Sequence, residues 1–428
     1  MNIKPELLNR PLILRGTVIP NRIAKSATSE ALADRQTGQP TQDLIRVYER
    51  WGQGGAGLLI TGNVLVDLEG RTEPGNVVIT DDRYLPGLKH WAQSAQANGA
   101  KLFMQINHAG RQTSRRISAD PVAPSPVPMR GFMGMFGKPR ELSHGEIREL
   151  IRRYAFAAGL AQRAGFSGVQ IHAAHGYLAS QFLSPRTNLR TDEWGGDAAR
   201  RRRFLIEIVR AVRAEVGADF PIAVKLNSAD FQKGGFSEEE SMAVVRALEA
   251  EGIDLLEISG GSYEQSAMMG SDGNVRESTR RREAYFLTYA SKVRSLTKLP
   301  LLLTGGMRTA ETMEQVLAEG HVDMVGIARP LFVETDLPAR ILAGKAAAAV
   351  QVTTKVGVRL FDDMLELVWY QAQLRRIARG LAPDAKLGRL GALVSGYFLS
   401  YAFNPLRLLV PRKVAHLVPE PGPGEATA

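Results

Sequence analysis

Residues 168–177 read Gly-Val-Gln-Ile-His-Ala-Ala-His-Gly-Tyr, and the interpretation of the whole chain starts from this stretch. Its first four residues are typical of a short buried strand, and His172, His175 and Tyr177 follow directly. Parallel α/β proteins place their chemistry at such strand ends. Two imidazoles can donate hydrogen bonds to one carbonyl oxygen, and a phenol can protonate a neighbouring carbon. The stretch therefore predicts a site that polarises a carbonyl compound and supplies a proton to it.

The same three residues have two other interpretations. They could be structural histidines beside a core tyrosine, or the histidines could be metal ligands. A zinc site needs three or four ligands of the N, S or O type, and the chain has neither an HExxH motif nor a cysteine. Only seven histidines occur in 428 residues, so two of them at one strand end favour chemistry, and no metal site is predicted.

Short β-like runs alternate with amphipathic helical patterns along the first 345 residues. We count eight runs: 22–27, 57–61, 101–106, 168–172, 222–226, 255–259, 301–304 and 324–328. Most are apolar throughout, as expected for parallel strands that are buried on both faces. They predict an α/β fold, a closed (β/α)8 TIM barrel. A doubly wound open sheet is the alternative, but no GxGxxG motif follows the first run to support it.

Two helical patterns begin with a capping box, in which a serine and a glutamate three residues later satisfy each other's backbone N–H groups. These are Ser143 with Glu146 and Ser237 with Glu240. Long loops follow the third and sixth runs, at 108–142 and 260–282. The first contains methionines and phenylalanines that could form a lid over a substrate or simply pack together.

Composition limits the classes of ligand and the compartment. The net charge of +10 suggests phosphorylated ligands or an anionic surface. Nucleic acid is not predicted, because the one dense basic run, Arg200–Arg203, lies at the expected start of a helix and suits solvated ion pairs. The lack of cysteine excludes disulfides and cysteine-ligated clusters. Residues 1–20 show no signal-peptide pattern, so we expect a cytoplasmic protein, with membrane association an open question.

The pattern changes near residue 345. We therefore expect two units, a barrel over 1–345 and a mainly helical C-terminal extension over 346–428. A helix is predicted over 359–380, and residues 390–403 are uncharged but shorter than the roughly twenty residues that span a membrane. Basic residues lie between these segments. They suit either peripheral contact with a membrane surface or packing in a homo-oligomer.

Five motifs in the first 345 residues resemble the Old Yellow Enzyme family, the FMN-dependent ene-reductases. They occur in the expected order at Asn21–Ala27, Gln105–Arg111, Ile171–Leu178, Phe182–Gly196 and Gly326–Arg329. The third and fourth motifs together are highly specific. The chain is also similar to the N-terminal half of 2,4-dienoyl-CoA reductases, although it lacks their cysteine-bound cluster and their nucleotide-binding module.

The resemblance implies an oxidoreductase that transfers hydride from NADH or NADPH, through FMN, to the activated C=C bond of a small molecule such as an enone. His172 and His175 would hold the carbonyl group and Tyr177 would donate the proton. The implied flavin-binding residues come from several places in the chain: Ser26, Ala27, Thr28, Asn63, Gln105, Lys225, Gly305, Gly306, Ala328 and Arg329. Within this set Gln105 and Lys225 would meet the flavin pyrimidine, and Gly305, Gly306 and Arg329 the phosphate.

Three departures from the family pattern stand out. Ser29 lies where some relatives have a redox-tuning cysteine, Asn63 where many have a small residue, and Lys225 where many have an arginine. Lysine keeps the charge but loses the forked geometry of the guanidinium. Two other functions remain open: a flavin-binding, membrane-attached interaction module, and a flavin-free barrel lyase in which Lys225 forms a Schiff base. The natural substrate, the choice of NADH or NADPH and the oligomeric state are not predicted.

Overall fold

The computed structural model describes residues 5–130, 132, 134–259, 287–305, 307–350, 359–388 and 391. Eight parallel strands form a closed ring in the order β3, β4, β7, β10, β11, β12, β13, β14, with β14 pairing back to β3. Their bounds are Ile23–Lys25, Leu58–Ile60, Lys101–Asn107, Gly168–Ala173, Ile222–Asn227, Leu255–Ser259, Leu301–Thr304 and Met324–Ile327. The predicted TIM barrel is confirmed, and the open-sheet alternative is wrong because the ring closes.

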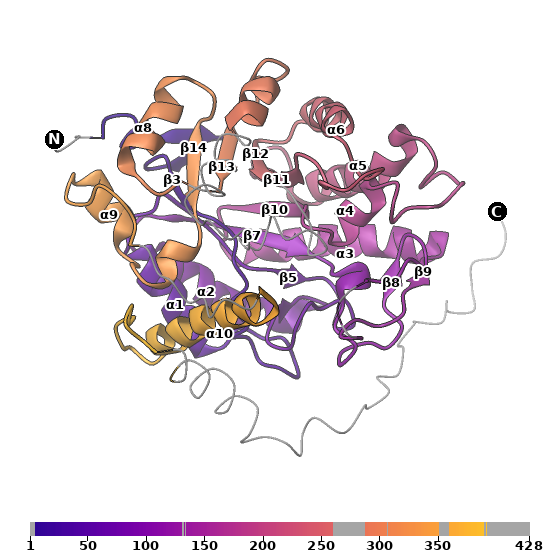
Figure 1. Cartoon of the computed structure of the whole chain (residues 1–428), viewed down its shortest axis with the longest axis horizontal. Coiled ribbons are helices and arrows are strands. Elements are labelled where there is room, and N and C mark those ends of the chain that lie inside the picture. The colour runs from indigo at the N-terminus through magenta and orange to yellow at the C-terminus, as the bar shows by residue number, and fades with distance from the viewer. Residues whose placement is uncertain are drawn as a thin grey trace.

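Helices surround the barrel (Figure 1). Those described are α1 (Gln42–Gly52), α2 (Leu85–Gln96), α3 (His144–Arg163), α4 (Leu178–Leu183), α5 (Ala198–Val216), α6 (Glu238–Ala250), α8 (Ala310–Ala318), α9 (Leu337–Leu342) and α10 (Arg359–Ala378). Both predicted capping boxes are present, at the starts of α3 and α6. Each of these two helices ends two residues before a glycine with positive φ, Gly165 and Gly252, which is a common way for a helix to stop.

Shorter elements extend the loops. Those described are the 3-10 turns η1 (Asp82–Tyr84), η2 (Gly110–Gln112) and η4 (Arg329–Phe332) and the strands β1 (Leu12–Leu14), β2 (Thr17–Ile19), β5 (Val64–Leu65), β6 (Val77–Val78), β8 (Val122–Ala123) and β9 (Arg140–Glu141). In the long loop after β7, β8 pairs with β9, and the rings of Phe132 and Phe136 contact each other at 5.2 Å. The expected loop over 260–282 lies outside the described residues.

The barrel interior changes from apolar to polar along the strands. Near the amino ends, residues such as Ala24, Phe103 and Leu255 form one apolar cluster with side chains of the β1–β2 hairpin. Successive side chains of a strand point to opposite faces, so the residues two places further on also face inward. At those places Ser26, Gln105 and Glu257 are buried polar residues. The barrel therefore has an apolar floor and a polar layer towards the carboxyl ends of its strands.

The basic run at the start of α5 forms ion pairs, as predicted. Arg200 pairs with Asp197 at 2.9 Å and Arg203 with Glu193 at 2.7 Å, while buried Arg201 pairs with a glutamate of α6. The contact of Arg201 joins α5 to α6; this residue is buried, whereas the sequence suggested a solvated run.

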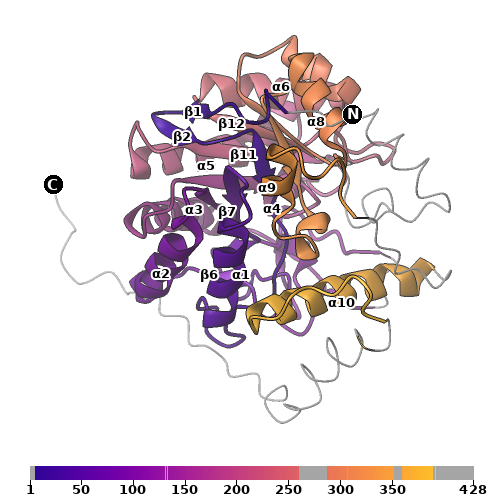
Figure 2. The ribbon, with the colours of Figure 1, turned by 90° about the vertical axis from the view of Figure 1, so that its left-hand side faces the viewer.

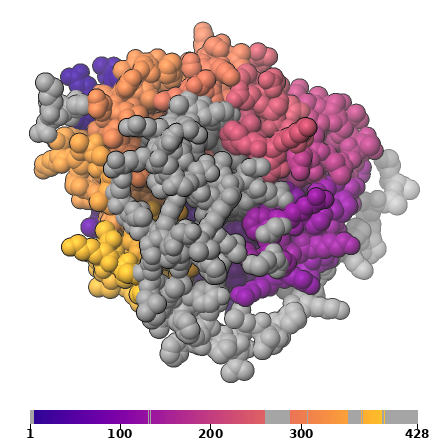
Figure 3. All heavy atoms as spheres, in the orientation of Figure 1, coloured from indigo at the N-terminus to yellow at the C-terminus, as the bar shows by residue number. Residues whose placement is uncertain are grey.

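Helix α10 packs against α1 and η4, and two views of the ribbon show it beside α1 (Figures 1 and 2). In the space-filling view its yellow atoms adjoin the orange atoms of the preceding segment (Figure 3). Leu374 and Ile377 belong to the same apolar core cluster as the barrel and its helices. None of the described helices is long and apolar enough to cross a membrane. The predicted boundary at residue 345 stays a prediction, and apart from Gly391 the stretch 390–403 lies outside the described residues.

Candidate active site

The site is built where β10 ends. His172 is the fifth residue of this strand and faces the barrel interior, with its Cα in register with that of Lys225 on β11. The His172 ring lies 5.1 Å from the His175 ring and 4.9 Å from the Tyr177 ring, centroid to centroid. Both contacts are edge-on. The structure thus brings together the three residues that the sequence singled out, and His172 and Tyr177 are buried.

A tight turn makes this convergence. His175 has φ of 60°, in the left-handed region that non-glycine residues seldom occupy, and Gly176 follows with φ of 74°. Two side chains hold the turn: Asn227 Oδ1 accepts from the His175 N–H at 3.1 Å, and Gln112 Nε2 donates to the His175 carbonyl at 2.9 Å. Strained backbone persists where its surroundings fix it, and such places are often functional.

Both histidines are neutral near pH 7. Burial is the main cause that lowers the pKa of His172 and of His175 well below the ordinary value, and the charge of Lys225 lowers both further. Nδ1 of His172 accepts from the Ala174 N–H at 3.2 Å, so the ring proton of the neutral form lies on Nε2. His172 can therefore donate a hydrogen bond from Nε2 to an oxygen in the barrel mouth.

His175 has a hydroxyl partner. Its Nε2 lies 2.7 Å from Oγ of Ser259, the last residue of β12, and either atom can be the donor. If Ser259 donates, the His175 proton lies on Nδ1, which then becomes a second donor. The serine would then fix which imidazole nitrogen carries the proton.

Asn63 contacts the phenol of Tyr177. Its Nδ2 donates to the Tyr177 hydroxyl oxygen at 3.3 Å, and Asn107 Nδ2 donates to Asn63 Oδ1 at 3.0 Å. The sequence suggested that Asn63 contacts the flavin, and this role stays a prediction. Asn107 was missed, although it lies two residues beyond Gln105 on the same inward-facing side of β7.

Gln105 and Lys225 are joined through residues that the sequence analysis missed. Gln105 Nε2 donates to Gln170 Oε1, Gln170 Nε2 donates to Glu257 Oε2, and Lys225 Nζ donates to Glu257 Oε1, each at 2.8 Å. All four side chains are buried. One signal could have revealed Glu257: it is the only charge in the buried run Leu-Leu-Glu-Ile-Ser of β12.

A second buried lysine, Lys25, lies between the barrel and α1. Lys25 Nζ donates to the Ile60 carbonyl at 3.1 Å and lies 4.3 Å from the Trp51 ring centroid and 3.8 Å from Glu30. Burial lowers the pKa of Lys25 to about 8, although the carboxylate of Glu30 partly opposes this shift. The sequence motifs do not single out Lys25, although a charged residue at the end of a buried strand is a recognisable signal.

The predicted phosphate residues lie at the ends of the last two barrel strands. Gly305, with φ of 130°, follows β13, and Ala328 and Arg329 follow β14. Arg329 is partly exposed and pairs through one guanidinium nitrogen with Glu366 of α10 at 2.7 Å. Gly306 lies outside the described residues.

The strand-end segment Ser26–Thr28 lies beside these residues. The hydroxyls of Ser26 and Thr304 are 2.7 Å apart, and Ala27 packs against the apolar floor of the barrel. Among the residues that the structure describes, none is a hydrogen-bond partner of the buried Thr28 hydroxyl. FMN presents ring N–H groups, ring carbonyl oxygens and a phosphate on its side chain, so this set of buried amides, hydroxyls and cations has the chemistry to hold it.

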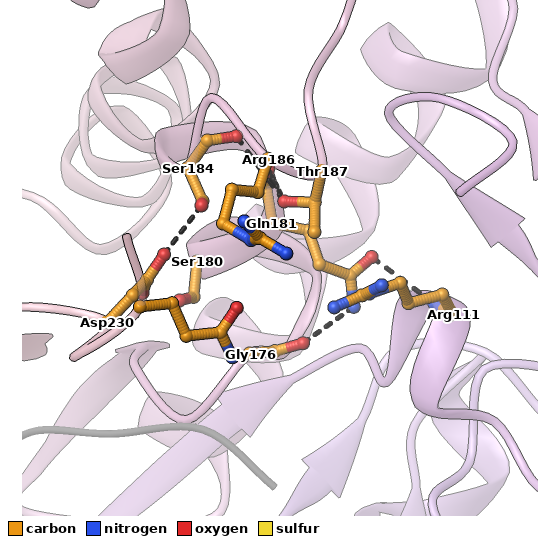
Figure 4. A pocket seen from close by; sticks show the side chains of 9 residues that line it. Arg111, Gly176, Ser180, Gln181, Ser184, Arg186, Thr187 and Asp230 are labelled. Atoms are coloured by element: carbon orange, nitrogen blue, oxygen red, sulfur yellow. Dashed lines mark hydrogen bonds between the residues drawn. The ribbon is translucent and has the colours of Figure 1, made fainter. Parts of the chain in front are cut away.

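A small pocket lies next to the site, with Gly176 of the turn among the residues that line it (Figure 4). Arg111, Gln181 and Asp230 are among the side chains that line it. Ser184 Oγ donates to Asp230 at 2.5 Å, and Gln181 Nε2 donates to the Gly176 carbonyl at 2.7 Å. The first bond joins the end of α4 to the loop after β11, and the second holds the turn at Gly176 against α4. Among the described residues, no three His, Cys, Asp or Glu side chains are grouped as a metal site.

Comparison with known proteins places the chain in a family. The model described as the NADH:flavin oxidoreductase / NADH oxidase family matches residues 7–347. The NADH-dependent flavin oxidoreductase iliE of Hypocrea jecorina is 36% identical over 394 residues, which cover 85% of this chain and 94% of that protein. The NADH oxidase of Thermoanaerobacter brockii is 38% identical over 331 residues; they cover 77% of this chain but only 49% of that protein.

A solved structure agrees in fold. The Old Yellow Enzyme homologue from Zymomonas mobilis superposes with a TM-score of 0.67 at 27% identity, over 80% of this chain and 94% of that one. The chain therefore belongs to the NADH:flavin oxidoreductase family of Old Yellow Enzyme homologues and is an NAD(P)H-dependent flavin oxidoreductase.

Proposed function

We propose that the protein is an FMN-dependent ene-reductase, which reduces the C=C bond of a small activated alkene with hydride from NADH or NADPH. The observation that carries the proposal is the convergence of three rings at one strand end, with the His172 ring 5.1 Å from that of His175 and 4.9 Å from that of Tyr177. Two neutral donors beside one proton source suit a substrate with a carbonyl group next to its double bond.

FMN, rather than a larger flavin, suits the residues at the strand ends. Ser26, Ala27, Thr28, Gln105 and Lys225 would meet the ring system, and Gly305, Gly306, Ala328 and Arg329 would meet the phosphate. Barrels of this fold frequently bind phosphate at the loops after the seventh and eighth strands. The guanidinium of Arg329 keeps donors beyond the one that binds Glu366, and these can pair with a phosphate oxygen.

When bound, FMN supplies the carrier that accepts hydride from NADH or NADPH and passes it to the alkene. The protein's own residues act on the substrate. His172 Nε2 donates to the carbonyl oxygen, and His175 donates beside it if Ser259 holds its proton on Nδ1. These bonds withdraw electron density from the β-carbon, which receives the hydride. Tyr177 gives its proton to the α-carbon, so the alkene gains one hydride and one proton in total. General-acid catalysis of this kind contributes a factor of about 10²–10⁴ in rate.

The Schiff-base alternative is disfavoured by the surroundings of Lys225. Its Nζ is held at 2.8 Å by the buried carboxylate of Glu257, so the amine is engaged in an ion pair and is not free to attack a substrate carbonyl. The membrane-attached module needs no catalytic geometry, whereas the turn at His175 is held by two dedicated side chains.

One experiment tests the proposed function. The purified protein should be yellow, its visible flavin band should bleach when NADH or NADPH is added without oxygen, and an enone should restore it. The cofactor released by heat should migrate as FMN. A colourless protein, or one whose reduced flavin an enone panel leaves unchanged, would refute the ene-reductase assignment.

A further inference from the structure

We propose that Glu257 is a positioning residue that lowers the reduction potential of the flavin through Lys225 and orients Gln105. This inference rests on the proposed function, because it requires FMN in the barrel mouth. No family resemblance suggested Glu257, and the mechanism above does not use it.

The first observation is how completely the Glu257 carboxylate is engaged. Its side chain is fully buried, and it accepts three hydrogen bonds: from Lys225 Nζ at 2.8 Å, from Thr304 Oγ1 at 2.7 Å and from Gln170 Nε2 at 2.8 Å. The Cα atoms of Lys225 and Glu257 are in register on adjacent strands. A carboxylate so placed is held rigidly by the sheet.

The second observation is the direction of the hydrogen bonds. An ionised carboxylate only accepts, so Gln170 must turn its amide nitrogen to Glu257 and its oxygen to Gln105. Gln105 then uses Nε2 to donate to Gln170 at 2.8 Å, and its Oε1 stays available to accept from a ring N–H group. Likewise the single proton of Thr304 goes to Glu257, so Ser26 donates to Thr304. One charge thus fixes the orientation of two expected flavin contacts, Ser26 and Gln105.

The third observation concerns charge. Reduction of a flavin adds negative charge to its pyrimidine, and a lone cation there would raise the reduction potential. Lys225 is instead paired with a carboxylate in a buried layer, where electrostatic effects are strong. The pair has no net charge. Glu257 therefore offsets the positive charge of Lys225. The reduced flavin is then a stronger hydride donor than it would be beside an unpaired lysine.

The test measures the reduction potential of the FMN-loaded protein and its affinity for sulfite, which forms an anionic adduct with flavins. Glu257→Gln should shift the potential to a more positive value and tighten sulfite binding about tenfold. For a two-electron couple, a tenfold change in the equilibrium constant corresponds to about 30 mV. Lys225→Met should shift both quantities in the opposite direction.

A double variant controls for misfolding and tests whether Glu257 acts on the flavin through Lys225. Lys225→Met with Glu257→Gln removes both buried charges at nearly constant volume, which proteins often tolerate. Its potential should return close to that of the unaltered protein. Asp254→Asn is the matched control, because Asp254 is a buried carboxylate just before the amino end of the same strand and pairs with Arg15 and Arg213. Its potential should not move.

The outcomes separate this inference from the proposed function. If the unaltered protein binds no FMN, the proposed function fails. If FMN is bound and reduced but Glu257→Gln leaves the potential unchanged or makes it more negative, only the role of Glu257 is overturned. The same conclusion follows if Asp254→Asn shifts the potential as much as Glu257→Gln does.

Discussion

Asn63 donates a hydrogen bond from Nδ2 to the hydroxyl oxygen of Tyr177, 3.3 Å away, and is itself held by Asn107. A phenol oxygen that accepts this bond points its own proton elsewhere. The same bond stabilises the oxygen once the proton has left. The two amides therefore orient the group that we expect to protonate the substrate.

Replacing Tyr177 by phenylalanine should separate the two halves of the reaction. Reduction of the flavin by NADH or NADPH should proceed at a near-normal rate, because the ring is kept and only the hydroxyl is lost. Oxidation by an enone should slow by about 10²-fold or more. Stopped-flow measurements of each half-reaction check this, with Tyr154→Phe as a control at a buried hydroxyl in α3 that has no hydrogen-bond partner in the described part of the chain. Equal rates for Tyr177→Phe and the unaltered protein would assign the proton to another donor.

Asn63→Leu should have a smaller effect of the same kind. One hydrogen bond is worth about 1 kcal/mol, so the enone step should slow roughly fivefold to tenfold while flavin reduction changes little. In the Tyr177→Phe background the substitution should have no further effect on the enone step, because the hydroxyl that it orients is gone. Additive losses in the double variant would show that Asn63 acts elsewhere, for example on the flavin.

Removing donors should weaken carbonyl binding. His172→Ala should reduce the affinity for phenol-type ligands about tenfold to a hundredfold, the cost of a hydrogen bond to a charged group. Ser259→Ala should cost less, since His175 keeps its ring but loses the partner that fixes its proton. Titrations followed by the charge-transfer band measure both affinities. A chelator should leave activity intact, and activity that zinc restores after chelation would instead favour a metal site.

The buried histidines should also make stability depend on pH. Burial lowers the pKa of His172 and His175 in the folded protein, whereas the unfolded chain has values near 6.5. Below pH 6.5 the unfolded chain therefore binds more protons, so the free energy of unfolding falls as the pH falls. Between about pH 7.5 and about pH 5.5, His172→Gln/His175→Gln should lose less stability than the unaltered protein. Denaturant titrations at the two pH values decide this, and equal losses would mean that the histidines titrate normally.

The fold was predictable because its signals are local. Each barrel strand is an apolar run between helical patterns, and Ser143 and Ser237 mark helix starts through their neighbours three residues on. The convergence of His172, His175 and Tyr177 was predictable for the same reason, since six residues contain it. The capping boxes and the spacing of the three rings depend on residues close in sequence, whereas the side chains that hold the turn, Asn227 and Gln112, lie far from it in the chain.

The missed residues depend on register. Gln170 faces Gln105, and Glu257 faces Lys225, only because the ring of strands closes with one particular stagger. Nothing near Glu257 in the sequence shows which residue of β11 it will meet. The pair of Arg329 with Glu366 joins the barrel to α10 and could not be read from the motif that contains Arg329.

Helix α10 of the C-terminal extension packs into the core of the barrel and its helices. Leu374, Ile377 and Ala378 of α10 are buried in the core shared with the barrel, and Arg46 of α1 donates to the Ala378 carbonyl at 3.2 Å. We therefore expect α10 to be part of the folded unit. A chain ending at Gly388 should fold, bind FMN and turn over. A chain ending at Val350 should have a lower melting temperature, because it leaves an apolar surface uncovered. It should also bind FMN more weakly, because Arg329 loses the ion-pair partner, Glu366, that holds its guanidinium in place.

Comparing these two chains with the full-length protein also tests the role of residues 389–428. Flotation with anionic vesicles and light scattering measure membrane binding and oligomer size. If the segment binds a membrane surface, the full-length protein floats and the chain ending at Gly388 does not. If it packs between subunits, the oligomer shrinks instead. A chain ending at Val350 that is as stable and as yellow as the others would place the domain boundary before α10, near residue 345, and would show that the contacts of α10 contribute little to the barrel.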